Sequence, residues 1–147
     1  RGGVSDATKD AGPAGYSGTP LPKKLGIKAG FRVLYVSAPE GFDPGPLPDG
    51  VEVDEEAGEG PYDVVLAFAA DRAAMDAHYA ALPEKLARNG ALWICWPKKS
   101  SGIVTDVGET VVRESALALP VGLVDVKIAA IDATWSGLKL VYRLTHR

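Results

Sequence analysis

The segment Phe31-Arg32-Val33-Leu34-Tyr35-Val36-Ser37 predicts the centre of the fold. It is short, almost wholly apolar and rich in β-branched and aromatic residues, as is typical of a strand buried on both faces of a parallel sheet. Two later runs, at 62–69 and 91–96, have the same character. Helical patterns follow both of these runs, and strands that alternate with helices indicate a doubly wound, mainly parallel α/β sheet.

The connections between these strands differ. Four prolines at 39–50 exclude a helix after the first strand, so we expect an extended loop leading to a short edge strand at 51–53. Asp71 caps the next predicted helix, and Asn89-Gly90 is expected to end it. Its apolar residues recur at helical spacing: Met75, Tyr79, Leu82 and Leu86.

The two ends of the chain add smaller elements. A short helix is expected from Thr19, as its N-cap, to Gly26, which would end it in a left-handed conformation. Asp106 and Glu109 read as a capping box that opens another helix. Strands at 123–131 and 138–144, joined by a tight turn at 132–137, predict a C-terminal antiparallel hairpin.

Composition excludes several classes of protein. The 147 residues include 16 basic and 19 acidic ones, and the net charge of -3 argues against a nucleic-acid or anionic-membrane partner. The single cysteine, Cys95, excludes an internal disulfide and a cysteine zinc site. No apolar run could span a bilayer or serve as a signal peptide, so a cytoplasmic location is expected. We predict a flexible arm at 1–15 and a single domain at 16–147.

Basic and hydroxyl side chains gather near one predicted edge of the sheet. In α/β sheets, ligands bind beyond the carboxyl ends of the strands, where the loop at 97–102 and the terminal hairpin should meet. Lysines and hydroxyls beside a helix N-terminus suit a phosphate or carboxylate. The predicted anion site consists of Lys98, Lys99, Ser100, Ser101, Ser136 and Lys139, with Trp135 as a wall. The alternative is a solvated basic loop, and Asp106 and Glu109 would compete for the same helix N-terminus.

The remaining chemistry-bearing residues have structural explanations. Ser17 and Thr19 could bind a ligand, although Thr19 also suits a capping role. His78 and His146 have no metal-ligand spacing and are expected at the surface, whereas Cys95 is expected in the core. No serine, histidine and acid trio is visible, and no catalytic residue is predicted.

An α/β sheet that ends in an antiparallel hairpin resembles the S-adenosylmethionine-dependent methyltransferase fold, over roughly residues 31–144. In that family a glycine-rich turn after the first strand approaches the cofactor, and an acid after the second strand binds the ribose. The resemblance implies Ser37, Glu40 and Gly41 for the turn, which here holds a single glycine, and Asp54 for the acid.

A second resemblance involves four strings: Gly15-Tyr16-Ser17-Gly18-Thr19-Pro20-Leu21, Lys23-Lys24-Leu25-Gly26-Ile27, Trp96-Pro97-Lys98-Lys99 and Thr134-Trp135-Ser136-Gly137-Leu138-Lys139. They resemble those of a bacterial domain family of unknown function, which implies no activity. The predicted function is a non-catalytic module that binds a small anionic molecule, without a cofactor. The alternatives are an S-adenosylmethionine-dependent methyltransferase and a module that binds a protein partner through its N-terminal segment.

Overall fold

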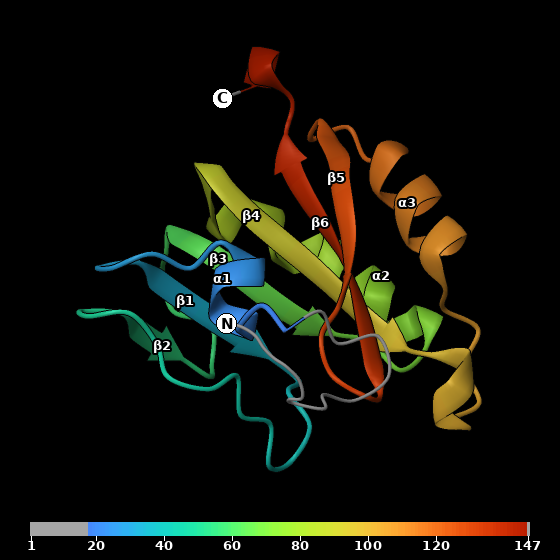
Figure 1. Cartoon of the computed structure of the whole chain (residues 1–147). Helices are drawn as coiled ribbons and strands as arrows, with labels where there is room; N and C mark the ends of the chain where they lie inside the picture. The colour runs from blue at the N-terminus through green and yellow to red at the C-terminus, as the bar shows by residue number, and fades with distance from the viewer. Residues whose placement is uncertain (1–17, 147) are drawn as a thin grey trace.

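The computed structural model describes residues 18–146, and the strands in this part of the chain form one sheet in the order β2-β1-β3-β4-β6-β5 (Figure 1). The first three strands along the chain are β1 (Arg32–Val36), β2 (Glu52–Asp54) and β3 (Tyr62–Phe68). They are followed by β4 (Leu86–Pro97), β5 (Leu123–Ala130) and β6 (Trp135–Tyr142). The predicted arm at 1–15 and the candidate Ser17 lie outside the described residues.

The predicted fold class, a mainly parallel α/β sheet with a C-terminal antiparallel hairpin, is confirmed. Strand β1 pairs in parallel with β2 and β3, and β3 pairs in parallel with β4. Strand β6 lies antiparallel between β4 and β5. The turn that joins β5 to β6 therefore lies at the edge where β4 ends, as expected.

Helices cover the sheet unequally (Figure 1). On one face, α2 (Arg72–Ala81) and α3 (Glu109–Leu117) bury Met75, Tyr79, Val112 and Ala116 in a first core cluster. On the other, α1 (Leu21–Leu25) and the loop after β1 contribute Leu21, Leu25, Phe42 and Leu47 to a second cluster. Short 3₁₀ turns complete the described chain: η1 (Pro83–Lys85), η2 (Lys99–Ser101) and η3 (Leu144–His146).

Strand β1 has the two-sided burial that its composition predicts. Val33 and Leu34 are both fully buried, yet they belong to the clusters on opposite faces. Residues 39–50 form no helix, and β2 is an edge strand, as their sequences indicate. Gly26 ends α1 with a φ of 80°, and the Asp71 side chain accepts a hydrogen bond from the Ala74 N–H at 2.8 Å. These local predictions are confirmed.

The prediction that Asn89-Gly90 ends a helix is wrong. Helix α2 ends at Ala81, and Leu86 and Asn89-Gly90 belong to β4. A Cβ atom on Gly90 would lie 2.8 Å from the Asp63 carbonyl oxygen of the neighbouring strand. The glycine therefore permits a close approach of two backbones, at an irregularity in the β3–β4 pairing.

Three other expected boundaries move. The N-cap of α1 is Pro20, not Thr19, and α3 begins at Glu109 after Gly108, not at Asp106. The expected turn at 132–137 is shorter, because Trp135, Ser136 and Gly137 already belong to β6. Among residues 18–146, no helix has both the length and the apolar character needed to cross a bilayer.

Candidate functional site

The end of β4 and the turn between β5 and β6 are joined directly. The Lys98 N–H donates to the Thr134 carbonyl at 2.7 Å. The Asp132 carboxylate accepts from the Thr134 and Trp135 N–H groups at 2.8 and 2.9 Å, which fixes the turn. The basic loop and the hairpin therefore form one surface at the carboxyl edge.

A cavity of about 530 Å³ opens at this surface, on the face that α3 covers. Lys98, Lys99 and Ser136 line it, so the structure brings together three of the predicted site residues. The other lining residues come from the end of β4, from β5, from the segment before α3 and from the start of α3: Trp96, Pro97, Thr105, Val107, Gly108, Glu109, Thr110, Val111 and Ile128. The cavity thus combines cationic and hydroxyl groups with an apolar wall.

The N-terminus of α3 contributes to the cavity through its backbone. The first-turn N–H groups of a helix have no intrahelical carbonyl partner, and a capping side chain usually satisfies one of them. In α3 the N-cap is Gly108, and no side chain of residues 18–146 caps the helix. Gly108, Glu109 and Thr110 all line the cavity. The sequence pattern does not predict this uncapped helix start, because it indicates Asp106 as the capping residue.

Asp106 instead caps the neighbouring helix. Its carboxylate accepts from the Arg72 N–H, at the start of α2, at 2.9 Å. The Thr105 hydroxyl donates to the Ala70 carbonyl at 2.6 Å and accepts from the Val107 N–H at 3.1 Å. The segment before α3 is thereby attached to the start of α2, and the predicted competition of Asp106 for the α3 N-terminus does not occur.

Glu109 is held by a cation. Arg113 approaches the Glu109 carboxylate at 2.6 Å and the Asp125 carboxylate of β5 at 2.9 Å. The hydrogen bond from Arg113 lowers the pKa of Asp125, and the hydrogen bonds to Glu109 and Asp125 raise the pKa of Arg113. Because Arg113 offsets the Glu109 charge, the one acidic residue that lines the cavity opposes an anion less than its exposure suggests.

Trp135 and Lys139 do not reach this cavity. Ser136 lies opposite Trp96 across the β4–β6 ladder, whereas Trp135 lies opposite Pro97 and Lys139 opposite Trp93. Since successive strand residues point to opposite faces, Trp135 and Lys139 occupy the α1 face. Trp135 packs edge-on against Phe68, with ring centroids 5.1 Å apart. Trp135 therefore lies beside the basic loop in the strand pairing, but neither it nor Lys139 lines the cavity that holds Lys98 and Lys99.

Ser100 and Ser101 lie in η2, and neither lines the cavity. The Ser101 hydroxyl donates to the Lys98 carbonyl at 2.6 Å and accepts from the Ile103 N–H at 3.1 Å. It therefore stabilises the loop that carries the lysines, and Ser100 is exposed beside it.

The residues implied by a methyltransferase-type cofactor site are not arranged to hold S-adenosylmethionine. The Asp54 carboxylate accepts from the Tyr62 hydroxyl at 2.5 Å and lies 3.5 Å from an Arg32 nitrogen. Ser37 and Glu40 are exposed, Ser37 has a φ of 58° and Gly41 one of 80°, and no helix follows β1. The loop does not fit the cofactor, because it lacks the helix start that would face a ligand, whereas the contacts of Asp54 involve only its Oδ2 atom.

Two single residues complete the comparison with the sequence. The prediction that His78 lies at the surface is wrong: it is 7% exposed, and its Nε2 donates to the Phe68 carbonyl at 2.8 Å. The His146 side chain lies outside the described part of the chain. Cys95 is buried as predicted, and burial raises the pKa of its thiol. No group of three or more potential metal ligands occurs within residues 18–146.

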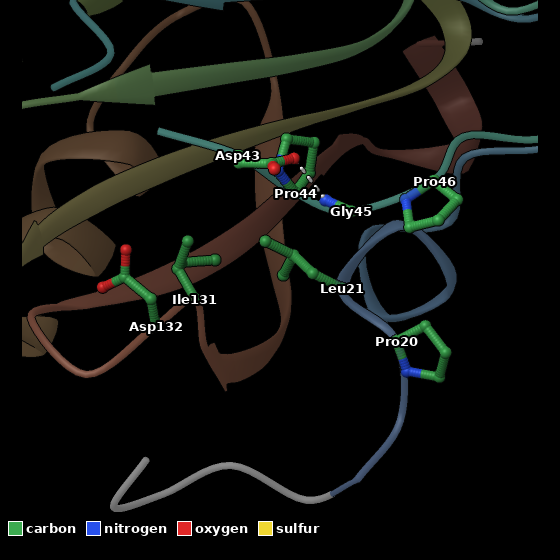
Figure 2. A pocket seen from close by; sticks show the side chains of 8 residues that line it. All are labelled: Pro20, Leu21, Asp43, Pro44, Gly45, Pro46, Ile131 and Asp132. Atoms are coloured by element: carbon green, nitrogen blue, oxygen red, sulfur yellow. Dashed lines mark hydrogen bonds between the residues drawn. The ribbon is translucent and has the colours of Figure 1, made fainter. Parts of the chain in front are cut away.

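A second cavity at the same edge, of about 310 Å³, lies on the α1 face (Figure 2). It is lined by Pro20, Leu21, Asp43, Pro44, Gly45, Pro46, Ile131 and Asp132. Both carboxylates in it serve their own turns, since Asp43 accepts from the Gly45 N–H at 2.9 Å and Asp132 accepts from two N–H groups of the hairpin. They are structural groups of the loops.

Comparison with known proteins identifies no family for this chain. No protein-family model matches the sequence, and no curated protein matches it significantly. One similar solved structure is that of "a putative methyltransferase from Thermoplasma acidophilum", with 12% sequence identity and a TM-score of 0.48. The similarity covers 86% of this chain and 75% of that one. The resemblance to a bacterial family of unknown function stays a prediction.

Proposed function

We propose that the chain is a non-catalytic module that binds a small anionic molecule at the cavity between the end of β4 and the start of α3. The phosphate or carboxylate of the ligand accepts hydrogen bonds from the first-turn N–H groups of α3. Lys98, Lys99 and Ser136 contact the same group. The apolar part of the ligand packs against Trp96, Val111 and Ile128.

The observation that carries this proposal is the uncapped α3 N-terminus within a basic cavity. A helix N-terminus favours an anion by about 0.3–1 kcal/mol at an exposed site, and a charge-assisted hydrogen bond contributes about 1.5–3 kcal/mol. Either effect alone is small. At the upper ends of these ranges the two effects together amount to about 4 kcal/mol, the free energy of millimolar binding.

The solvated-loop alternative accounts for exposed lysines but not for the helix start. A helix that served only the fold would gain stability from a capping side chain, and the sequence offers Thr105 and Asp106 just upstream. Both side chains bond elsewhere. This arrangement supports a ligand as the missing acceptor.

Calorimetric titration with inorganic phosphate at low ionic strength tests the proposal. We expect saturable binding to the wild-type chain, and at least about tenfold weaker binding to a variant with Lys98→Ala and Lys99→Ala, because each lost cation removes a charge-assisted contact. Lys23→Ala, an exposed lysine on α1, is the matched control and should bind normally. Unchanged affinity in the double variant contradicts the proposal.

The same titration with S-adenosylmethionine and S-adenosylhomocysteine tests the methyltransferase alternative. Micromolar binding, worth about 8 kcal/mol, would favour that alternative over the proposal. Binding of a partner protein through the N-terminal segment, the arm and residues 15–21, stays a prediction, because most of that segment lies outside the described residues.

A further inference from the structure

A group of lysines without acidic partners lies on the α1 face of the sheet. Lys139 of β6 stands directly opposite Lys127 of β5 in the antiparallel ladder. Directly opposed residues in such a ladder have Cβ atoms about 5 Å apart, and like charges there are destabilising. Lys28, which follows α1, adds a third amine close enough to affect Lys139.

Lys28 and Lys139 both line a cavity of about 380 Å³. Phe31, Val126 and Val141 supply apolar surface in the same cavity. Gly26 lies beside it, and a Cβ atom there would be 3.9 Å from the Lys139 Nζ atom. The amine of Lys139 therefore occupies a confined position next to an open space, rather than extending freely into solvent.

Nothing in the described chain neutralises these amines. No ion pair or hydrogen bond within residues 18–146 involves the side chain of Lys28, Lys127 or Lys139. Asp63 also lines the cavity, where its carboxylate accepts the Arg32 N–H at 2.8 Å and forms no ion pair with these lysines. Burial, followed by the charges of Lys127 and Lys28, lowers the pKa of Lys139. The folded chain thus maintains a repulsive cluster that an anion would relieve.

Protection of the sheet edge explains only part of this cluster. Lysines on edge strands discourage pairing with other sheets, which accounts for Lys127 on β5. Lys139 lies on β6, an interior strand, and Lys28 lies outside the sheet. Their arrangement around a common cavity needs another explanation.

We propose that Lys28, Lys127 and Lys139 form a second anion site, which takes a phosphorylated small molecule whose apolar part packs against Phe31, Val126 and Val141. The site is distinct from the one at α3, because the two cavities share no lining residue. Ser136 and Lys139 are also three residues apart along β6, about 10 Å at the rise of a β-strand.

Inorganic pyrophosphate is the probe, titrated by calorimetry at low ionic strength into the full chain. We expect Lys139→Met to weaken binding at this site at least about tenfold, and Lys139→Arg to retain most of the affinity, since it keeps the charge. Lys28→Met should also weaken it. Lys23→Met, at an exposed lysine of α1 that does not line this cavity, should not.

The two proposed anion sites can be tested independently of each other. The double variant of Lys98 and Lys99 should leave this site intact, so pyrophosphate should bind the wild type at two sites and each set of variants at one. The inference is overturned if Lys139→Met and Lys28→Met bind pyrophosphate as the wild type does. It is equally overturned if affinity falls only because the variant unfolds, which thermal denaturation reveals. We expect Lys139→Met to be folded and at least as heat-stable as the wild type, because it removes a repulsive charge.

Discussion

The N-termini of α2 and α3 lie at the same edge of the sheet and differ in how their first-turn N–H groups are satisfied. In α2, Asp71 accepts from the Ala74 N–H at 2.8 Å, and Asp106 accepts from the Arg72 N–H at 2.9 Å. In α3 the N-cap is Gly108, and the side chains around the cavity include Lys98 and Lys99. Two carboxylates of the chain therefore accept from the first-turn N–H groups of α2, whereas no side chain of the described residues caps α3, which begins beside Lys98 and Lys99.

The capped N-terminus of α2 stabilises the fold, whereas the uncapped N-terminus of α3 is the one proposed to bind a ligand. Both helices follow strands of the parallel part of the sheet, so topology alone places both where ligands bind in α/β folds. The capping side chains decide between them. At α2 an external anion would meet two carboxylates, whereas at α3 it would meet unpaired N–H groups and lysines.

The largest expected effect comes from opening the α2 N-terminus. Loss of an N-cap acceptor costs about 1 kcal/mol, so the combined variant Asp71→Ala with Asp106→Ala should lose about 2 kcal/mol of unfolding free energy. Urea denaturation measures this loss. Asp49→Ala, an exposed acid outside both helices, is the control. A loss no greater than that of the control would mean that these carboxylates do not stabilise α2.

A capping side chain added at the α3 N-terminus should stabilise the fold and weaken anion binding. Gly108 has extended backbone angles, φ -153° and ψ -179°, and a Cβ atom there would meet nothing within 4 Å. Gly108→Asp can therefore cap α3, which should raise stability by a few tenths of a kcal/mol and weaken phosphate binding at least about tenfold, or 1.4 kcal/mol.

Gly108→Ser tests whether capping α3 weakens anion binding without an added negative charge, because the serine hydroxyl can cap the helix without repelling an anion. We expect an affinity between those of the wild type and Gly108→Asp. If phosphate binds Gly108→Asp as tightly as the wild type, the α3 N-terminus is not the anion site.

A smaller effect on phosphate affinity is expected when the ion pair between Arg113 and Glu109 is removed. Arg113→Met removes the cation that holds the Glu109 carboxylate at 2.6 Å, so the negative charge can act on the nearby cavity. Phosphate affinity should fall severalfold by calorimetry. Adding Glu109→Gln to the same chain should restore the affinity, and a failure of this rescue would show that Arg113 acts in another way.

The fold was predictable where the signal is local. Val33 and Leu34 belong to a run whose composition alone indicates burial on both faces, and Asp71 directly precedes the helix that it caps. Asp106 has the same local signal before α3, but its partner is the Arg72 N–H, 34 residues away in sequence. Only the packing of the α2 and α3 N-termini against each other determines which of the two helices Asp106 caps. The burial of His78 likewise depends on a distant acceptor, the Phe68 carbonyl.

The candidate site was predictable in part for a similar reason. Lys98, Lys99 and Ser136 meet because the edge rule brings the end of β4 and the hairpin together. The sequence predicts Trp135 in the hairpin turn and Lys139 just after it, and on that basis the hairpin contributes both residues to the same site. Once β6 begins at Trp135, strand alternation places both residues on the face opposite Ser136. Because the predicted strand begins three residues too late, at 138 instead of Trp135, the prediction places residues from opposite faces of the sheet in one site.

The smallest expected effect concerns pH and the ion pairs of α3. The Arg113 hydrogen bond lowers the pKa of Asp125 below its usual 3.8, so the unfolded chain takes up the proton at a higher pH than the folded chain does. The stabilisation by this pair is therefore complete above about pH 4 and is lost as the pH falls through the lowered folded pKa. Asp125→Asn should flatten this acid limb of the stability curve, whereas Asp49→Asn should not. Because the Asp125 side chain is 32% exposed, added salt should also reduce the difference between the variant and the wild type, as it would not for the neutral packing of α3 on the sheet.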